Sequence, residues 1–191
     1  YQYNDEGIRT VKTVNGVKHE YTVSGGQISR EVIYSSNGQY VTKDLRYYYD
    51  AAGNPTAIRA FTRTGSNAAF TDTKYYLLTN MQGDVVAIYN ENGDRIFEYV
   101  YDAWGNILRS TQVATGGNAA NNVNPFRYRG YYYDTDTGLY YLQTRYYNPQ
   151  WGRFLNADNA TVIADSSTIS DKNMFAYCDN NPVMRSDDGG E

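Results

Sequence analysis

Short stretches of alternating apolar and polar residues recur along the chain, separated by turns of one type. Each turn has Asn, Asp or Ser at its first position and Gly at its fourth. The polar side chain caps the turn and Gly takes the positive φ that other residues resist, so each copy predicts two strands joined by a tight connection. The copies are residues 4–7, 50–53, 80–83, 90–93, 102–105 and the longer turn 134–138, with looser copies at 35–38 and at the Asn-Gly hairpin signal 15–16.

The spacing of these turns indicates a repeat architecture. Between Asn80 and Gly105 they come ten to twelve residues apart, which leaves room for strands of about six residues. In repeat proteins each unit buries its apolar face only against its neighbours. We therefore expect a series of antiparallel hairpins.

Residues 139–147 read as one further strand, which Asn148-Pro149 ends. Alternation gives it two faces, one with Tyr140, Leu142, Thr144 and Tyr146, the other with Tyr141, Gln143, Arg145 and Tyr147. Neither face is purely apolar. The pattern predicts a sheet with one packed side and one wet, aromatic side, as in the wall of a hollow structure.

Three segments depart from the hairpin pattern. Residues 64–73 and 115–124 are small, polar and rich in Gly and Asn, which predicts surface loops. After residue 156 the alternation fades. There Ser170 and Asp171 are predicted to cap a short helix from Lys172 to Cys178, and this segment is expected to turn inward.

Composition supports an all-β class. The 191 residues include 22 Tyr and 17 Gly but only 4 Pro, and tyrosine suits pleated surfaces on which its hydroxyl still finds a partner. The net charge of -4 argues against a nucleic-acid partner, because phosphate binding is driven largely by Lys and Arg. From residue 156 onward the chain has seven acidic residues and only two basic ones. An acidic tail therefore follows a nearly neutral region.

Few residues suit metal, redox or membrane functions. The single cysteine, Cys178, and the single histidine, His19, cannot form an internal disulfide or a zinc site. We interpret Cys178 as a buried inert thiol and His19 as a strand residue beside a hairpin. No run approaches the roughly 20 apolar residues of a membrane helix. No signal peptide opens the chain, and we expect neither a metal nor a cofactor.

Two sets of motifs carry a resemblance to a known family. The Tyr-Asp-x-x-Gly copies resemble the YD repeats of Rhs proteins. Residues 126–156, with Arg-Tyr-Arg-Gly, Asp-x-x-Thr-Gly-Leu-Tyr-Tyr and Arg-Tyr-Tyr-Asn-Pro-x-x-Gly-Arg-Phe, resemble the Rhs-repeat-associated core domain. The resemblance covers nearly the whole chain.

The resemblance implies the C-terminal end of a longer bacterial polymorphic toxin. In such families, β-hairpins spiral into a hollow shell and the core domain seals one end beside the toxin. It implies three regions here: repeat shell at 1–125, core strands at 126–156, and an acidic plug at 157–191. The implied partners are the rest of the shell and a toxin domain in cis. The implied location is secreted or cell-surface, with an export signal outside this sequence.

The resemblance also implies a self-cleavage site. In Rhs-like proteins that cut themselves, Gly-Arg-Phe precedes a first Asp-Pro-x-Gly-Leu, and the chain is cut after a second. Aligned with that pattern, Arg153 falls in Gly-Arg-Phe and the aspartates fall on Asp158 and Asp187. Two neighbouring carboxylates cannot both stay charged, so one acts as acid while the other activates water. Arg153 is expected to orient a carboxylate through a bidentate contact.

The chain departs from this pattern in ways that keep a second interpretation open. Asn159 stands where Pro is expected, and the second copy reads Asp187-Asp188-Gly189-Gly190-Glu191, without Pro or Leu. In the second interpretation Asp158 caps a turn, and Asp187 and Asp188 lie in a solvated tail. No role is assigned to Asp188. Beyond single-turnover self-cleavage we expect no catalytic activity.

Two further interactions follow from the residues. Trp104 and Trp151 are candidate platforms for stacking on a carbohydrate, which would make the chain a surface binding module without catalytic activity. The alternative for both is packing between hairpins. A segment of a spiral also leaves strand edges unpaired, which predicts self-association.

Overall fold

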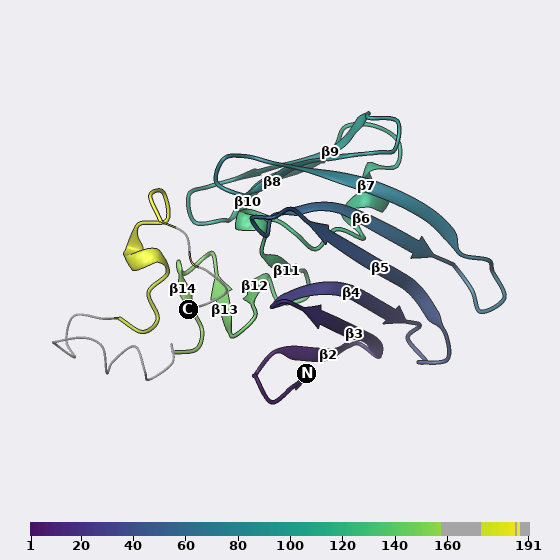
Figure 1. The fold of residues 1–191 in the computed structure, drawn as a ribbon, viewed down its shortest axis with the longest axis horizontal. Helices are drawn as coiled ribbons and strands as arrows, with labels where there is room; N and C mark the ends of the chain where they lie inside the picture. The colour runs from purple at the N-terminus through teal and green to yellow at the C-terminus, as the bar shows by residue number, and fades with distance from the viewer. Residues whose placement is uncertain (158–172, 186, 188–191) are drawn as a thin grey trace.

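The computed structural model describes residues 1–157, 173–185 and 187. Ten strands form one antiparallel sheet in chain order (Figure 1). They are β1 (Gln2–Tyr3), β2 (Arg9–Val14), β3 (Val17–Ser24), β4 (Gln27–Tyr34), β5 (Val41–Tyr49), β6 (Pro55–Thr62), β7 (Thr71–Thr79), β8 (Val85–Tyr89), β9 (Arg95–Tyr101) and β10 (Ile107–Gln112). We call this sheet the wall. The predicted all-β class and hairpin series are confirmed.

A second sheet follows the wall. Its four antiparallel strands are β11 (Tyr132–Asp134), β12 (Leu139–Leu142), β13 (Arg145–Asn148) and β14 (Arg153–Phe154). We call it the small sheet. The wall curves around it, with β8 to β10 on one side and β2 to β4 on the other (Figure 1).

The repeated turns have the predicted geometry. In the turn at 90–93, the Gly93 amide donates to the Asn90 carbonyl (3.1 Å), and the Asn90 side chain accepts from the amides of Asn92 and Asp94 (3.0 and 2.9 Å). The same side-chain capping recurs at Asn4, Asp50, Asn80 and Asp102. Gly93 has φ +83°, which explains why glycine ends the motif.

The main core lies between the wall and the small sheet. Leu45, Ile58 and Ile88 are at most 2% exposed on one face of the wall. Phe126 and Tyr132 pack against that face, with the Phe126 ring 4.9 Å edge-on from Tyr47. Tyr132 leads into the small sheet, so this aromatic contact docks the small sheet onto the wall.

The predicted single strand at 139–147 is wrong, because the chain reverses at Gln143 and Thr144. Gln143 has φ +50°, and the two flanking strands pair with Tyr140 opposite Tyr147 and Tyr141 opposite Tyr146. This pairing places Tyr140 with Tyr147 on one face. The reversal was missed because Gln-Thr is not a typical turn pair.

The expected wet face of this region is also wrong. Tyr140 and Tyr147 are fully buried in a second cluster with Tyr128, Phe154 and Tyr177. Tyr141 packs into the main core on the other side. The small sheet is therefore an interior layer between two aromatic clusters.

Two other segments differ from the prediction. Residues 115–124 are not simply a surface loop, since they contain α1 (Gly117–Asn121), whose Ala120 is fully buried. The predicted helix ending at Cys178 is not formed over the described residues 173–177. A 3-10 turn, η2 (Cys178–Asn180), follows instead. The inward turn does occur, because Tyr177 is fully buried.

Candidate functional site

Asp187 is held inside the molecule. Its carboxylate lies 3.3 Å from Nη2 of Arg145, and the two side chains are only 6% and 4% exposed. Arg145 stands on β13, where its guanidinium stacks on the Phe154 ring at 3.7 Å. The interpretation that places Asp187 in a solvated tail is therefore wrong.

The backbone of Asp187 is fixed as well. Its carbonyl accepts a hydrogen bond from the Tyr131 hydroxyl (2.8 Å), and Tyr131 in turn receives one from Tyr177 (3.3 Å). Burial raises the pKa of both tyrosines, so they act as neutral donors. Side chain and carbonyl of Asp187 are thus positioned by separate groups.

Arg129 anchors the segment just before Asp187. It lies in η1 (Tyr128–Gly130) and donates to the carbonyl of Gln82 (2.9 Å), in a wall turn, and to that of Pro182. The Gln82 side chain also donates to the Val183 carbonyl (3.2 Å). Residues 182–183 are therefore bound to the edge of the wall.

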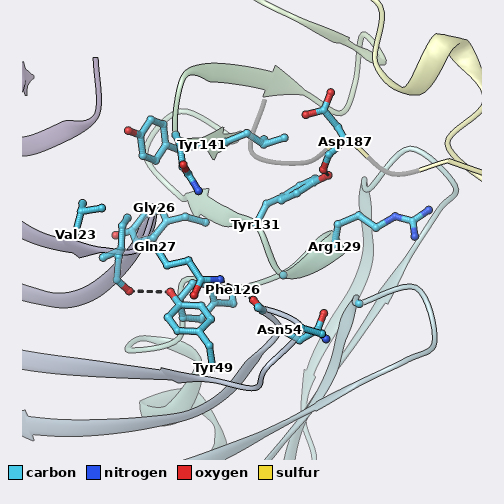
Figure 2. A pocket seen from close by; sticks show the side chains of 18 of the residues that line it. Val23, Gly26, Gln27, Tyr49, Asn54, Phe126, Arg129, Tyr131, Tyr141 and Asp187 are labelled. Atoms are coloured by element: carbon cyan, nitrogen blue, oxygen red, sulfur yellow. Dashed lines mark hydrogen bonds between the residues drawn. The ribbon is translucent and has the colours of Figure 1, made fainter. Parts of the chain in front are cut away.

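A cavity of about 280 Å³ opens beside Asp187 (Figure 2). Tyr49, Phe126 and Tyr141 give it an aromatic lining, and the side-chain amides of Gln27 and Asn54 stand at the wall turns. Figure 2 shows Asp187 and Tyr131 on the side opposite Tyr49. The cavity therefore combines apolar surface with a few polar amide groups.

The other predicted site residues are placed differently. Arg153 is exposed on β14, and among the described residues no hydrogen bond or ion pair joins it to Asp187. Asp158 and Asp188 lie outside the described residues. The catalytic roles of Asp158, Asp187 and Arg153 stay predictions. Arg145 was not predicted as a site residue, although a charged side chain within a tyrosine-rich strand was a signal for a buried partner.

The remaining singled-out residues fall into structural positions. Cys178 is buried, as predicted, and burial raises the pKa of its thiol. His19 lies on β3, as predicted, and bonds to Glu31. Trp104 packs beside Gly152, whereas Trp151 is 65% exposed. Over the described residues there is no cluster of three potential metal ligands, and no helix there is both long and apolar enough to cross a membrane.

Comparison with known protein families shows the family to which the chain belongs. Residues 67–183 match the family described as the teneurin YD-shell. The chain belongs to that family. The matched region runs from the wall through the small sheet to the anchored segment at 182–183, so the expected relationship to YD-repeat proteins is confirmed.

Relatives of this YD-shell chain include bacterial proteins of much greater length. The tRNA nuclease WapA of Bacillus subtilis is 37% identical over 193 residues, which covers 100% of this chain but 7% of that protein. The chain thus spans less than a tenth of the curated relatives it matches first.

Solved structures share the fold. A chain of the Photorhabdus luminescens Tc holotoxin pore, carrying a TccC3 mutation, superposes with a TM-score of 0.73 at 22% identity. The superposition covers 100% of this chain and 8% of the Tc toxin chain. TcdB2-TccC3 without its hypervariable C-terminal region gives a TM-score of 0.70, also at 22% identity, over 100% of this chain and 9% of that one.

Proposed function

We propose that this YD-shell segment forms the closing end of a secreted or cell-surface bacterial shell that encloses a toxin carried on the same polypeptide. The observation that carries the proposal is that the wall curves around the small sheet (Figure 1), whose residues pack against the wall in the main core. The similarity to a WapA nuclease and to a Tc toxin chain with a hypervariable C-terminal region supports it.

The test uses the complete protein and limited proteolysis of the region that follows residue 191. We expect this region to resist protease in the intact protein. Tyr132→Asp places a second charge beside Glu31 in the docking contact, and we expect it to expose the region. Tyr76→Asp, the same change at a side chain of β7 that is 47% exposed, is the matched control. Equal digestion of the region in all three proteins would contradict enclosure.

A second function, self-cleavage, is favoured by the fixed position of Asp187. We infer that Asp158 and Asp187 form an acid–base pair that cuts the chain after Glu191. One carboxylate takes a proton from water as it attacks the scissile carbonyl, and the other gives a proton to the leaving amide nitrogen. The products are a carboxylate and an amine.

In this proposal Arg145 is a positioning residue. Its guanidinium, held against Phe154, fixes the Asp187 carboxylate and favours its charged form. Arg153 keeps its predicted role toward Asp158.

The cleavage test uses the protein extended beyond Glu191 and mass spectrometry after long incubation. We expect fragments that end at Glu191, and intact protein for Asp158→Asn and Asp187→Asn. Asp179→Asn, an exposed aspartate of the same segment, is the control and should still be cut. Intact wild-type protein would overturn the self-cleavage proposal and leave the enclosure proposal standing.

A further inference from the structure

A second and larger cavity, of about 620 Å³, lies away from Asp187. It is bounded by the inner face of β2 to β5 and by residues 121–125. Val17, Ile33, Leu45 and Val123 supply apolar lining. Its volume falls within the range of roughly 300–1,000 Å³ that is typical of small-molecule sites.

One row of side chains crosses the strands at this cavity. Lys12 on β2 pairs opposite His19 on β3, His19 opposite Ile33 on β4, and Ile33 opposite Lys43 on β5. Directly paired residues share a face of the sheet, and all four line the cavity. His19 and Lys43 are two strands apart, about 10 Å between backbones.

The cationic groups around the cavity are not equally satisfied. Lys12 is paired with Asp134 (2.9 Å) and Asp136 (3.0 Å). Arg127 donates to the carbonyl of Asn124 and to the side chain of Asn121. Lys43 bonds only to the Asn122 carbonyl (3.2 Å), and no carboxylate of the described residues lies within ion-pair distance of it.

The charge of the lining is therefore positive. The lining residues include three cations, Lys12, Lys43 and Arg127, and two carboxylates, Glu31 and Asp136. Their formal charges sum to +1. Burial lowers the pKa of Lys43, and the negative charge of Glu31 offsets only part of this effect. A single negative charge would balance this site.

His19 has a fixed orientation beside the same space. Its Nδ1 lies 2.6 Å from Oε1 of Glu31, and Glu31 accepts further hydrogen bonds from Tyr47 (2.6 Å) and Tyr132 (2.9 Å). Within the described part of the chain, the other ring nitrogen of His19 makes no hydrogen bond. A polar group and an unbalanced ammonium thus share a cavity with apolar walls.

We propose that this cavity binds a small organic molecule with one carboxylate and an apolar tail. The carboxylate pairs with the ammonium of Lys43, and the tail packs on Ile33, Leu45 and Val123. A monoanion fits better than a phosphate dianion, because Lys43 is the single lining cation of the described residues that lacks a carboxylate or a full set of acceptors.

The test measures binding of hexanoate to the protein by NMR, read at the Lys43 side-chain amine and the His19 ring. Hexanamide, which has the same tail without the charge, is the ligand control. We expect hexanoate to bind about tenfold more tightly than hexanamide, since hydrogen bonds to charged groups are the stronger ones. Lys43→Met, which keeps the apolar stem, should remove this preference.

Lys74→Met is the matched control variant, because Lys74 lies on the exposed face of the wall beside Glu91. It should leave the preference intact, and thermal unfolding of both variants checks that they fold. Equal binding of the two ligands, or a preference that survives in Lys43→Met, would overturn the proposal.

A competition arm identifies the source of the carboxylate. An unstructured peptide of Glu and Leu residues that displaces hexanoate would indicate an acidic side chain of an enclosed polypeptide. Failure of the peptide to displace hexanoate would indicate a free small molecule. Displacement would thus overturn the free small molecule as the occupant, and failure to displace would support it.

Discussion

The outer face of the wall and the seam between the two sheets both carry many charges, but they are arranged in opposite ways. On the outer face, Arg30, Arg46, Arg59 and Lys74 form a row across β4 to β7, each directly opposite the next. Like charges in that position repel. Exposed carboxylates compensate them, as in the Arg59–Asp72 pair at 2.7 Å.

In the seam the charges are buried. Arg9 is fully buried, donates to Asp134 (2.5 and 3.2 Å), and lies over the rings of Tyr21 and Tyr141 at 4.8 and 4.3 Å. Exposed ion pairs contribute little because water screens them, whereas a buried charge that loses its partner is strongly destabilising. We infer from this difference that a few buried residues of the seam provide most of the stability of the contact between the small sheet and the wall.

The largest effect is expected from removing the seam carboxylate. Asp134→Ala leaves the buried Arg9 without its carboxylate partner, and it removes one of the two carboxylates that pair with Lys12. We therefore expect the free energy of unfolding to fall by about 3–5 kcal/mol. Asp72→Ala, on the outer face, should leave the unfolding curve almost unchanged. Urea denaturation of both variants measures the contrast, and similar shifts in the two midpoints would refute it.

Two glycines of the repeated turn separate local strain from packing at the seam. Gly105 and Gly93 have nearly equal φ, +86° and +83°, so alanine should cost each roughly 1–2 kcal/mol of backbone strain. A Cβ at Gly105 would lie 2.6 Å from the Tyr128 ring, whereas one at Gly93 meets nothing within 4 Å. Overpacking should add about 1–3 kcal/mol at Gly105 alone.

Thermal unfolding of the two alanine variants tests this difference. Tyr128→Leu in the Gly105→Ala background should recover part of the loss by making room. If Gly93→Ala is as destabilising as Gly105→Ala, the seam contributes nothing beyond the turn itself.

The comparison also explains what was predictable from sequence. The wall turns were predicted because each is a local device, in which Asn90 caps amides two and four residues ahead. The reversal at Gln143 was missed because its φ of +50° is a left-handed conformation that residues other than glycine rarely adopt. Propensity alone favoured a continuous strand there.

The candidate site was predictable only in part. Asp187 was found by motif, but its partner Arg145 lies 42 residues away in sequence, and no local pattern encodes that contact. Arg153 was favoured because it sits in the motif, yet its side chain is exposed. Motif position therefore pointed to a segment that is partly buried, whereas the pairing of Asp187 with Arg145 depended on how the small sheet folds.

In the seam, we expect Glu31 to make the free energy of unfolding depend moderately on pH in the acid range. Burial alone would raise the pKa of Glu31, but hydrogen bonds from His19, Tyr47 and Tyr132 outweigh it, so its pKa lies below the ordinary value of 4.5. A carboxyl with a lowered pKa adds stability above pH 4.5, and this stability is lost as the pH falls through the lower folded-state value.

We therefore expect the unfolding free energy of the protein to fall below pH 4.5 more steeply than that of Glu31→Gln. Asp44→Asn, which removes an outer-face carboxylate beside Arg30, is the control and should change this slope less. Denaturation curves from pH 7 to pH 3 measure both. Parallel curves for the protein and Glu31→Gln would show that Glu31 does not titrate with unfolding.

The smallest effect concerns the sheet edges, which neither the seam nor the outer ion pairs protect. Within the described residues, β10 pairs with β9 alone and β1 with β2 alone, so backbone groups at these edges are free to pair with a second copy. We expect weak, concentration-dependent dimers in light scattering. Leu108→Lys adds a charge on β10, at a side chain that is 65% exposed, and should weaken them. Met81→Lys, at a fully exposed turn position away from that edge, should not. A strict monomer at high concentration would show that the edges are already blocked.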